Sequence, residues 1–143
     1  MPTKLQKAWV LPWADCFLLL KVSIFLAIIQ ILIKLFPLKI VLRLLSRPQA
    51  FPGDPAFRPY RTVNLVELTS RYHVPRPTCL EKALVLYSLL RSRGIAAELT
   101  IGTAKKSGAF KAHAWVELHG QVIMGSSAEP YAPLLTVLPQ GIK

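Results

Sequence analysis

The chain has 143 residues, of which 52% are hydrophobic and 17% charged, and 18 basic residues against 7 acidic ones give a net charge of +11. This hydrophobic share, together with three Trp, four Tyr and six Phe, excludes an intrinsically disordered chain, because disorder requires low hydrophobicity and few aromatic residues. The length fits one domain. Two cysteines are too few for a disulfide scaffold and favour a reducing compartment.

The positive charge does not form a single patch in the sequence. Residues 1–50 carry seven basic residues and one acidic residue, and residues 51–143 carry eleven and six. Because basic residues spread in this way lack interleaved aromatic residues, we do not expect nucleic-acid binding. No Cys-x-x-Cys pair, His-Glu-x-x-His motif or glycine-rich phosphate loop occurs in the sequence. We therefore expect neither a metal site nor a cofactor.

Residues 16–36 read CFLLLKVSIFLAIIQILIKLF and predict a long helix that is apolar on every side. Among its polar residues, Lys21, Gln30 and Lys34 do not share one helical face, so lipid or protein is expected all round it. A membrane span needs about 20 apolar residues, and the lysines near both ends are able to extend toward water. Pro37 ends the helix, and LKIVLRLLSR follows as a short basic amphipathic stretch.

Two interpretations of residues 1–46 stay open. In the first, a hydrophobic helical pair docks on the rest of the protein or on a partner subunit. In the second, residues 16–46 associate with a membrane, where neighbouring basic side chains favour the anionic cytoplasmic leaflet by about 1 kcal/mol each. Those side chains are Lys34, Lys39, Arg43 and Arg47. In both cases we expect the rest of the chain to be cytoplasmic.

A proline-rich stretch divides the chain. Residues 48–61 contain four prolines and a glycine, and proline lacks the amide proton that helices and sheets need. We therefore predict a hydrophobic basic segment at 1–47, a linker at 48–61 and a folded core at 62–143. The core opens with a helix that starts at Thr62 and ends near Tyr72.

Cys79 follows Pro77 and Thr78 and directly precedes the apolar pattern LEKALVLYSLLRSRG, which predicts a helix that Gly94 ends. Cys79 therefore lies at a helix N-terminus. The helix dipole and the unpaired amides there stabilise a thiolate and can stabilise an oxyanion. The segments IAAELTIGT, AFKAHAWVELHG and QVIM then predict an antiparallel sheet packed on this helix, which makes the fold class α+β.

The strand that contains His113 alternates between two faces. The face expected in the core comprises Phe110, Ala112, Ala114, Val116 and Leu118. The other face carries His113, which would serve Cys79 first as a base and then as an acid. The structural alternative makes Cys79 a small buried residue and His113 a hydrogen-bonding one. Trp115, beside His113 on the same face, either covers the sheet or forms a wall of a substrate groove.

The segment CLEKALVLYSLLRSRGIAAELTIGTAKKSGAFKAHAWVELHG resembles the leader peptidases of lasso-peptide biosynthesis. The shared pattern is Cys-Leu, a leucine-rich helix, Arg-Gly-Ile, Ile-Gly and Ala-His-Ala-Trp-Val-Glu, and the likeness covers residues 72–135. These enzymes are transglutaminase-like, papain-like cysteine peptidases. The resemblance implies a small papain-like core in which Cys79 is the nucleophile and His113 the base that remove the leader of a ribosomally made precursor peptide. It also implies two partners, a small leader-recognition protein and an asparagine-synthetase-like lasso cyclase.

One position departs from the family pattern. The family usually carries an aspartate about a dozen residues beyond the histidine, where this chain has Gly125. Glu117 shares the face of His113 but lies about 13 Å along the strand, too far to orient the imidazole. The remaining candidates for the third catalytic group are a backbone carbonyl and the side chains of Ser126, Ser127 and Glu129. The missing acid leaves an alternative function, a catalytically weakened relative that serves as a precursor-binding scaffold in the maturation complex.

Overall fold

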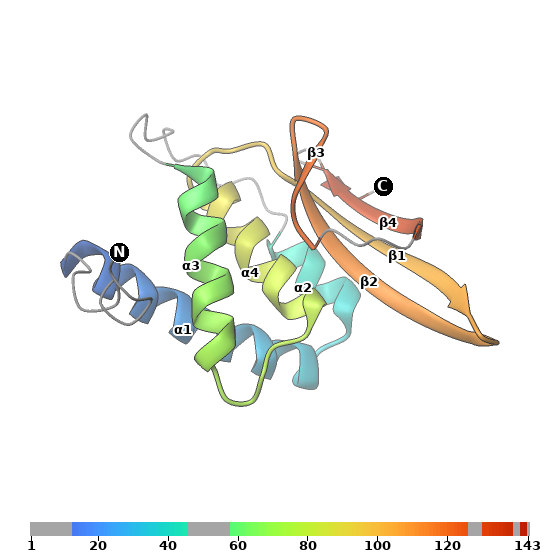
Figure 1. Cartoon of the computed structure of the whole chain (residues 1–143), viewed down its shortest axis with the longest axis horizontal. Coiled ribbons are helices and arrows are strands. Elements are labelled where there is room, and N and C mark those ends of the chain that lie inside the picture. The colour runs from blue at the N-terminus through green and yellow to red at the C-terminus, as the bar shows by residue number, and fades with distance from the viewer. Residues whose placement is uncertain (1–12, 46–57, 126–129, 139–140, 143) are drawn as a thin grey trace, which may run out of the picture.

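The computed structural model describes residues 13–45, 58–125, 130–138 and 141–142. Within these residues four helices pack on one side of a five-stranded antiparallel sheet, which confirms the predicted α+β class (Figure 1). The helices are α1 (Trp13–Leu35), α2 (Leu38–Leu45), α3 (Pro59–Tyr72) and α4 (Cys79–Ser92). The strands are β1 (Glu98–Lys106), β2 (Ala109–Leu118), β3 (Gln121–Met124), β4 (Ala132–Leu138) and β5 (Gly141–Ile142).

The predicted apolar helix is α1, which ends at Leu35, just before Pro37. Three side chains on its inner face are fully buried, namely Val22, Leu26 and Ile29. They pack in the core that α1 shares with α3 and α4. Burying a side chain of this size contributes about 1.5–3 kcal/mol. The first interpretation, docking on the rest of the chain, therefore describes the inner face of α1.

The core begins slightly ahead of its predicted boundary. Helix α3 starts at Pro59, three residues before Thr62, because proline suits the first helical turn, where its missing amide proton has no intrahelical partner to lose. Residues 48–57 of the predicted linker lie outside the described residues. Helix α3 ends at Tyr72, as predicted.

Helix α4 lies between the other helices and the sheet. It contacts α1 and α3 on one side and β1 and β2 on the other. Most of its side chains are therefore buried, among them Ala83, Leu84, Val85, Leu86, Tyr87, Leu89 and Leu90. This double contact explains why its sequence is apolar almost without interruption. Gly94 follows the helix with a φ of 75°, a left-handed conformation that commonly ends helices.

The strands follow the order β3-β2-β1-β4-β5 across the sheet. β1 and β2 form a long hairpin whose turn residues, Ser107 and Gly108, both have positive φ (51° and 81°), the geometry of a tight two-residue hairpin turn. The sequence does not predict β4 or β5. Pro133 near the start of β4 argues against a strand, and the residues after it lack a two-residue alternation.

The predicted core face of β2 holds only in part. Ala114, Val116 and Leu118 are buried against the helices, as predicted. Phe110 and Ala112 are exposed, and Phe110 is 78% exposed, so their assignment to the core is wrong. The β1–β2 hairpin extends beyond the layer of helices, so none of the four described helices covers its tip (Figure 1).

Candidate active site

Cys79 is the first residue of helix α4, and its side chain is partly buried. Thr78 caps this helix: its Oγ1 accepts a hydrogen bond from the Glu81 amide at 3.3 Å, and Glu81 Oε2 accepts one from the Thr78 amide at 2.7 Å. This capping box fixes where the helix begins. The predicted position of Cys79 at a helix N-terminus, where the dipole is positive, is confirmed.

The capping box continues into a buried network with α1. The side-chain amide of Gln30 donates to Glu81 Oε2 at 3.4 Å and to the carbonyl oxygen of Pro75 at 3.1 Å. Helix α1 thereby holds the loop before Cys79. The box itself has a sequence signal, the Thr-x-x-Glu spacing at 78–81. No local sequence signal indicates that Glu81 also binds Gln30, which is 51 residues away in the sequence.

His113 lies in β2, and its ring is partly buried. Its Nε2 is 2.5 Å from the carbonyl oxygen of Gly125, the residue after β3. Because a carbonyl oxygen only accepts, Nε2 carries the proton and donates, which leaves Nδ1 unprotonated in the neutral ring. The ring also stacks on Trp115, with 6.2 Å between centroids, and lies 5.0 Å from the ring of Tyr131. These contacts fix both the orientation and the tautomer of the imidazole.

Gly125 occupies the place where the resemblance predicts an aspartate. Its φ is 83°, a conformation that glycine adopts readily and other residues rarely do. A Cβ added here would lie 2.5 Å from the Ala114 carbonyl oxygen and 3.0 Å from the Trp115 Cα, so no side chain fits unless β2 moves. Of the four candidates for the third group, a backbone carbonyl, that of Gly125, contacts His113. The others, Ser126, Ser127 and Glu129, lie outside the described residues.

Trp115 and Glu117 form a pair beside the imidazole. The indole Nε1 of Trp115 donates to Glu117 Oε1 at 2.7 Å. The ring lies over β1, because a Cβ added at Gly102 would be 2.7 Å from its Cη2 atom. This position agrees with the interpretation in which Trp115 covers the sheet, while its role in a substrate groove stays a prediction. The Glu117 carboxylate is directed to Trp115 rather than to His113.

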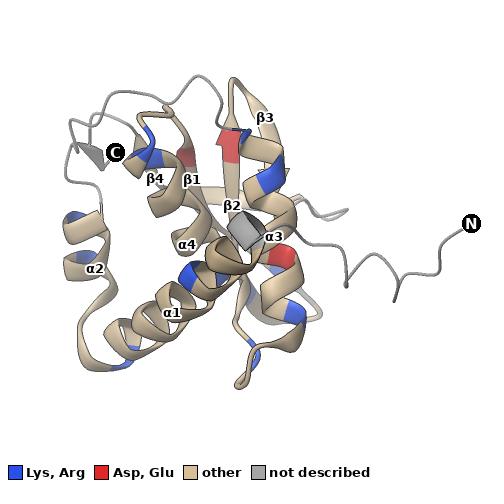
Figure 2. Cartoon of the chain, turned by 90° about the vertical axis from the view of Figure 1, so that its left-hand side faces the viewer, with Lys and Arg blue, Asp and Glu red and all other residues tan. Residues whose placement is uncertain are grey.

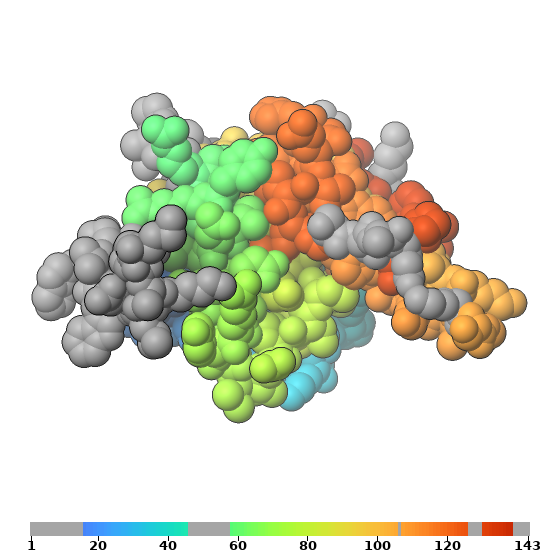
Figure 3. Space-filling view, viewed as in Figure 1, coloured from blue at the N-terminus to red at the C-terminus, as the bar shows by residue number. Residues whose placement is uncertain are grey.

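The structure brings the two elements of the predicted pair together. Helix α4, which begins at Cys79, packs against β2, which carries His113. In the space-filling view the yellow-green atoms around the start of α4 lie next to the orange atoms of β2 and β3 (Figure 3). Among the described residues no hydrogen bond joins the Cys79 thiol to the His113 ring, so their direct contact stays a prediction.

A small basic pocket lies beside the start of α4. Its volume is about 220 Å³, and it is lined by Glu67, Ser70, Arg71, Arg76, Pro77 and Lys82. Lys82 and Glu67 form an ion pair at 3.5 Å. Lys82 is three residues after Cys79 on α4, so the pocket lies one helical turn from the nucleophile position. In the described part of the chain, His, Cys, Asp and Glu side chains form no group of three or more that could hold a metal ion.

Comparison with known proteins gives one family. The family described as the transglutaminase-like superfamily matches residues 24–136. The match runs from the middle of α1 to β4 and includes both Cys79 and His113. No curated protein and no solved structure matches the chain.

Proposed function

Because the chain belongs to the transglutaminase-like superfamily, whose members are typically cysteine-peptidase-like, we propose that it is a cysteine peptidase that removes the leader peptide from a ribosomally synthesised lasso-peptide precursor. The observation that carries the proposal is the position of Cys79 at the capped start of α4, on a helix that packs against the strand of His113. The specificity for a lasso precursor rests on the resemblance of residues 72–135 to leader peptidases.

The first step is attack by the Cys79 thiolate on the scissile carbonyl carbon. Cys79 is the first residue of α4, where the positive end of the helix dipole attracts negative charge. A bond forms between Sγ and the carbonyl carbon, and the carbonyl oxygen becomes an oxyanion. We expect the amides of the first turn of α4 that the capping box does not use to stabilise that oxyanion.

The proton moves through Nδ1 of His113. Since Nε2–H is bound to Gly125, Nδ1 is the nitrogen that accepts the thiol proton. The imidazolium then gives this proton to the leaving amine as the C–N bond breaks, which leaves a thioester on Cys79. Water hydrolyses the thioester with Nδ1 as the base, which releases the leader and restores the thiol.

In this mechanism the Gly125 carbonyl orients the His113 ring in place of the missing acid. It holds the ring and the tautomer but carries only a partial negative charge, so it stabilises the imidazolium less than a carboxylate would. We expect slower turnover than in a relative with an aspartate. A cysteine at a helix terminus depends less on such an acid than a serine would, because its thiolate is already favoured.

The proposed partners are a precursor peptide, a small leader-recognition protein and an asparagine-synthetase-like cyclase, acting in the cytoplasm. These follow from the resemblance. A second function, a precursor-binding scaffold, is favoured by two observations: a neutral carbonyl stands at the acid position, and no hydrogen bond joins Cys79 to His113 among the described residues.

Co-expression of a candidate precursor with the recognition protein and this chain, followed by mass spectrometry of the precursor, separates the two functions. A peptidase cuts the precursor, and Cys79→Ala abolishes the cut. Cys16→Ala, which removes the exposed cysteine on α1, is the matched control and should cut normally. Uncut precursor with the wild-type chain, or an unchanged cut with Cys79→Ala, would refute the peptidase.

A further inference from the structure

The outer face of α1 carries a row of exposed apolar side chains. Their spacing of three and four residues places them on one side of the helix, opposite the buried inner face. They are Phe17, Leu20, Ile24, Ile28, Ile31 and Leu35, and each is between 44% and 71% exposed. We call these six residues the outer stripe. It runs for about 27 Å along the helix, at a rise of 1.5 Å per residue.

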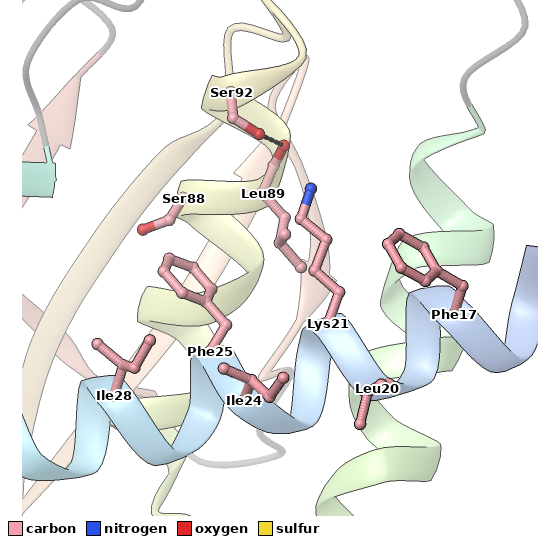
Figure 4. Close-up of a pocket in the computed structure, with 9 residues that line it drawn as sticks. All are labelled: Phe17, Leu20, Lys21, Ile24, Phe25, Ile28, Ser88, Leu89 and Ser92. Atoms are coloured by element: carbon pink, nitrogen blue, oxygen red, sulfur yellow. Dashed lines mark hydrogen bonds between the residues drawn. The ribbon is translucent and has the colours of Figure 1, made fainter.

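A groove widens this surface toward α4. It has a volume of about 470 Å³ and lies between α1 and one side of α4 (Figure 4). Phe25 and Ile28 of α1 point toward α4 in this view, and Leu89 closes the groove from above. Lys21, Ser88 and Ser92 also line the groove, and the rest of its lining is apolar. A connected apolar surface on a single chain marks a site that another apolar phase or molecule covers.

The charges along α1 and α2 are mostly positive, and Asp15 in the first turn of α1 is the one acidic residue between residues 13 and 45. Residues 16–45 contain no aspartate or glutamate, and their basic residues are Lys21, Lys34, Lys39 and Arg43, all exposed. Figure 2 shows these basic positions on α1 and α2. An apolar surface whose neighbouring charges are mostly positive fits a bilayer with anionic headgroups, which supplies acyl chains and negative charge together.

Helix α1 is long and apolar enough to cross a membrane, judged by the length and composition of residues 16–35. Its fold argues against crossing. The inner face is fully buried against α3 and α4, and Gln30 is bound to Glu81 and Pro75. A spanning α1 would have to leave these contacts or take the charged surfaces of α3 and α4 into the hydrocarbon.

We propose that α1 lies flat on the surface of an anionic lipid bilayer, with the outer stripe inserted among the acyl chains and the inner face kept in the protein core. Helix α4 separates α1 from β2, so the strand of His113 is directed away from the lipid. The membrane-bound protein thus keeps its sheet in the cytosol. This proposal does not depend on peptidase activity.

Vesicle flotation of the full-length chain tests the proposal. The probes are vesicles of phosphatidylcholine alone and of phosphatidylcholine mixed with phosphatidylglycerol. The wild-type chain should float with the mixed vesicles, and added salt should weaken binding. The double variant Leu20→Gln/Ile31→Gln should lower the partition coefficient by about tenfold or more. Phe110→Gln, which removes a 78% exposed apolar side chain at the hairpin tip, is the control and should bind like wild type.

If a second copy of the chain covers the outer stripe, or if α1 spans the membrane, the experiments give different results. A wild-type chain that stays with the soluble fraction overturns the proposal, and so does equal flotation of the double variant. A lipid-free dimer that the double variant abolishes would identify a second copy as the occupant. Resistance to alkaline extraction would identify a spanning helix, since a helix lying in the interface is released.

Two further variants guard against misfolding and against confusion with the catalytic proposal. Lys34→Gln/Lys39→Gln alters only exposed charge and should weaken binding to the anionic vesicles without changing the far-UV circular dichroism spectrum; binding that stays unchanged counts against the role of charge. Cys79→Ala should float like wild type. An unchanged precursor cut by Cys79→Ala, together with normal flotation, would therefore refute the peptidase alone.

Discussion

The two halves of the candidate site are built in different ways. The half around Cys79 is made mostly by neighbours along the chain, because Thr78 and Glu81 close the first turn of α4 on each other. The half around His113 is made by main chain and rings from other segments, Gly125 after β3 and Tyr131 before β4. The first half therefore depends mainly on α4 and on its contact with Gln30 of α1, whereas the second requires strands β2 to β4 to pair into a sheet. Substitutions should affect the two halves to very different extents.

Removing the imidazole tests the sheet half most strongly. His113→Ala should lower kcat for leader cleavage by about a hundredfold to ten-thousandfold, because proton transfer to and from the thiol is lost. The measurement is precursor cleavage followed by mass spectrometry over time. His119→Asn is the control, since His119 lies at an exposed turn with a φ of 51°, which asparagine tolerates. A wild-type rate in His113→Ala would exclude His113 as the base.

Placing an acid at Gly125 should damage the sheet half rather than complete it. Gly125→Asp forces a Cβ into the β2 main chain at a positive φ, and we expect a loss of about 2–5 kcal/mol in the free energy of unfolding with lower activity. Urea unfolding measures the loss. Gly120→Asp is the matched control, because Gly120 has a φ of 77° but no atom within 4 Å of its Cβ position. Higher activity in Gly125→Asp would contradict the structure.

Removing the cap should affect the helix half more gently. Thr78→Ala removes the oxygen that accepts from the Glu81 amide, and we expect the free energy of unfolding to fall by about 1 kcal/mol. Thermal or urea unfolding measures it. Thr69→Ala, which removes a hydroxyl bonded to the Leu65 carbonyl within α3, should change stability less. An equal fall in the free energy of unfolding in the two variants would show that the cap contributes no more than a side-chain hydrogen bond within a helix.

The smallest effect is expected deeper in α4. Burial raises the pKa of Tyr87 above its ordinary value of 10.0, and the nearby Arg91 guanidinium partly opposes this shift. Above pH 10 the unfolded chain loses this proton while the folded chain keeps it, so stability falls as the pH rises from 10 toward the raised pKa. Tyr87→Phe should therefore lose less stability than wild type over that window in urea unfolding. Tyr72→Phe, at an 80% exposed position, should follow wild type.

The helix half of the site was predictable because its signals are local. Pro77 and Thr78 before Cys79, and Gly94 after the apolar run, mark the ends of α4 without reference to the rest of the chain. The buried half of β2 followed from its two-residue alternation in the same way. The alternation could not show that the hairpin tip at Phe110 extends beyond the helices, because that depends on helix length and position.

The sheet half was only partly predictable because its contacts are distant in sequence. The candidates for the third group included a backbone carbonyl, but nothing in the sequence around Gly125 indicates that its oxygen meets His113. The bond between Gln30 and Glu81 joins residues 51 positions apart. Composition also could not show that α1 is buried on one side and exposed on the other, since both of its faces are equally apolar.

A main-chain oxygen behind the imidazole differs from a carboxylate in one further respect. An aspartate takes up a proton near pH 4 and then ceases to be a full acceptor, whereas an amide oxygen stays an acceptor throughout the range in which the domain is folded. It also belongs to the backbone, so no exchange of a side chain deletes it. The hydrogen bond that aligns the His113 ring therefore does not depend on the protonation state of an acidic side chain.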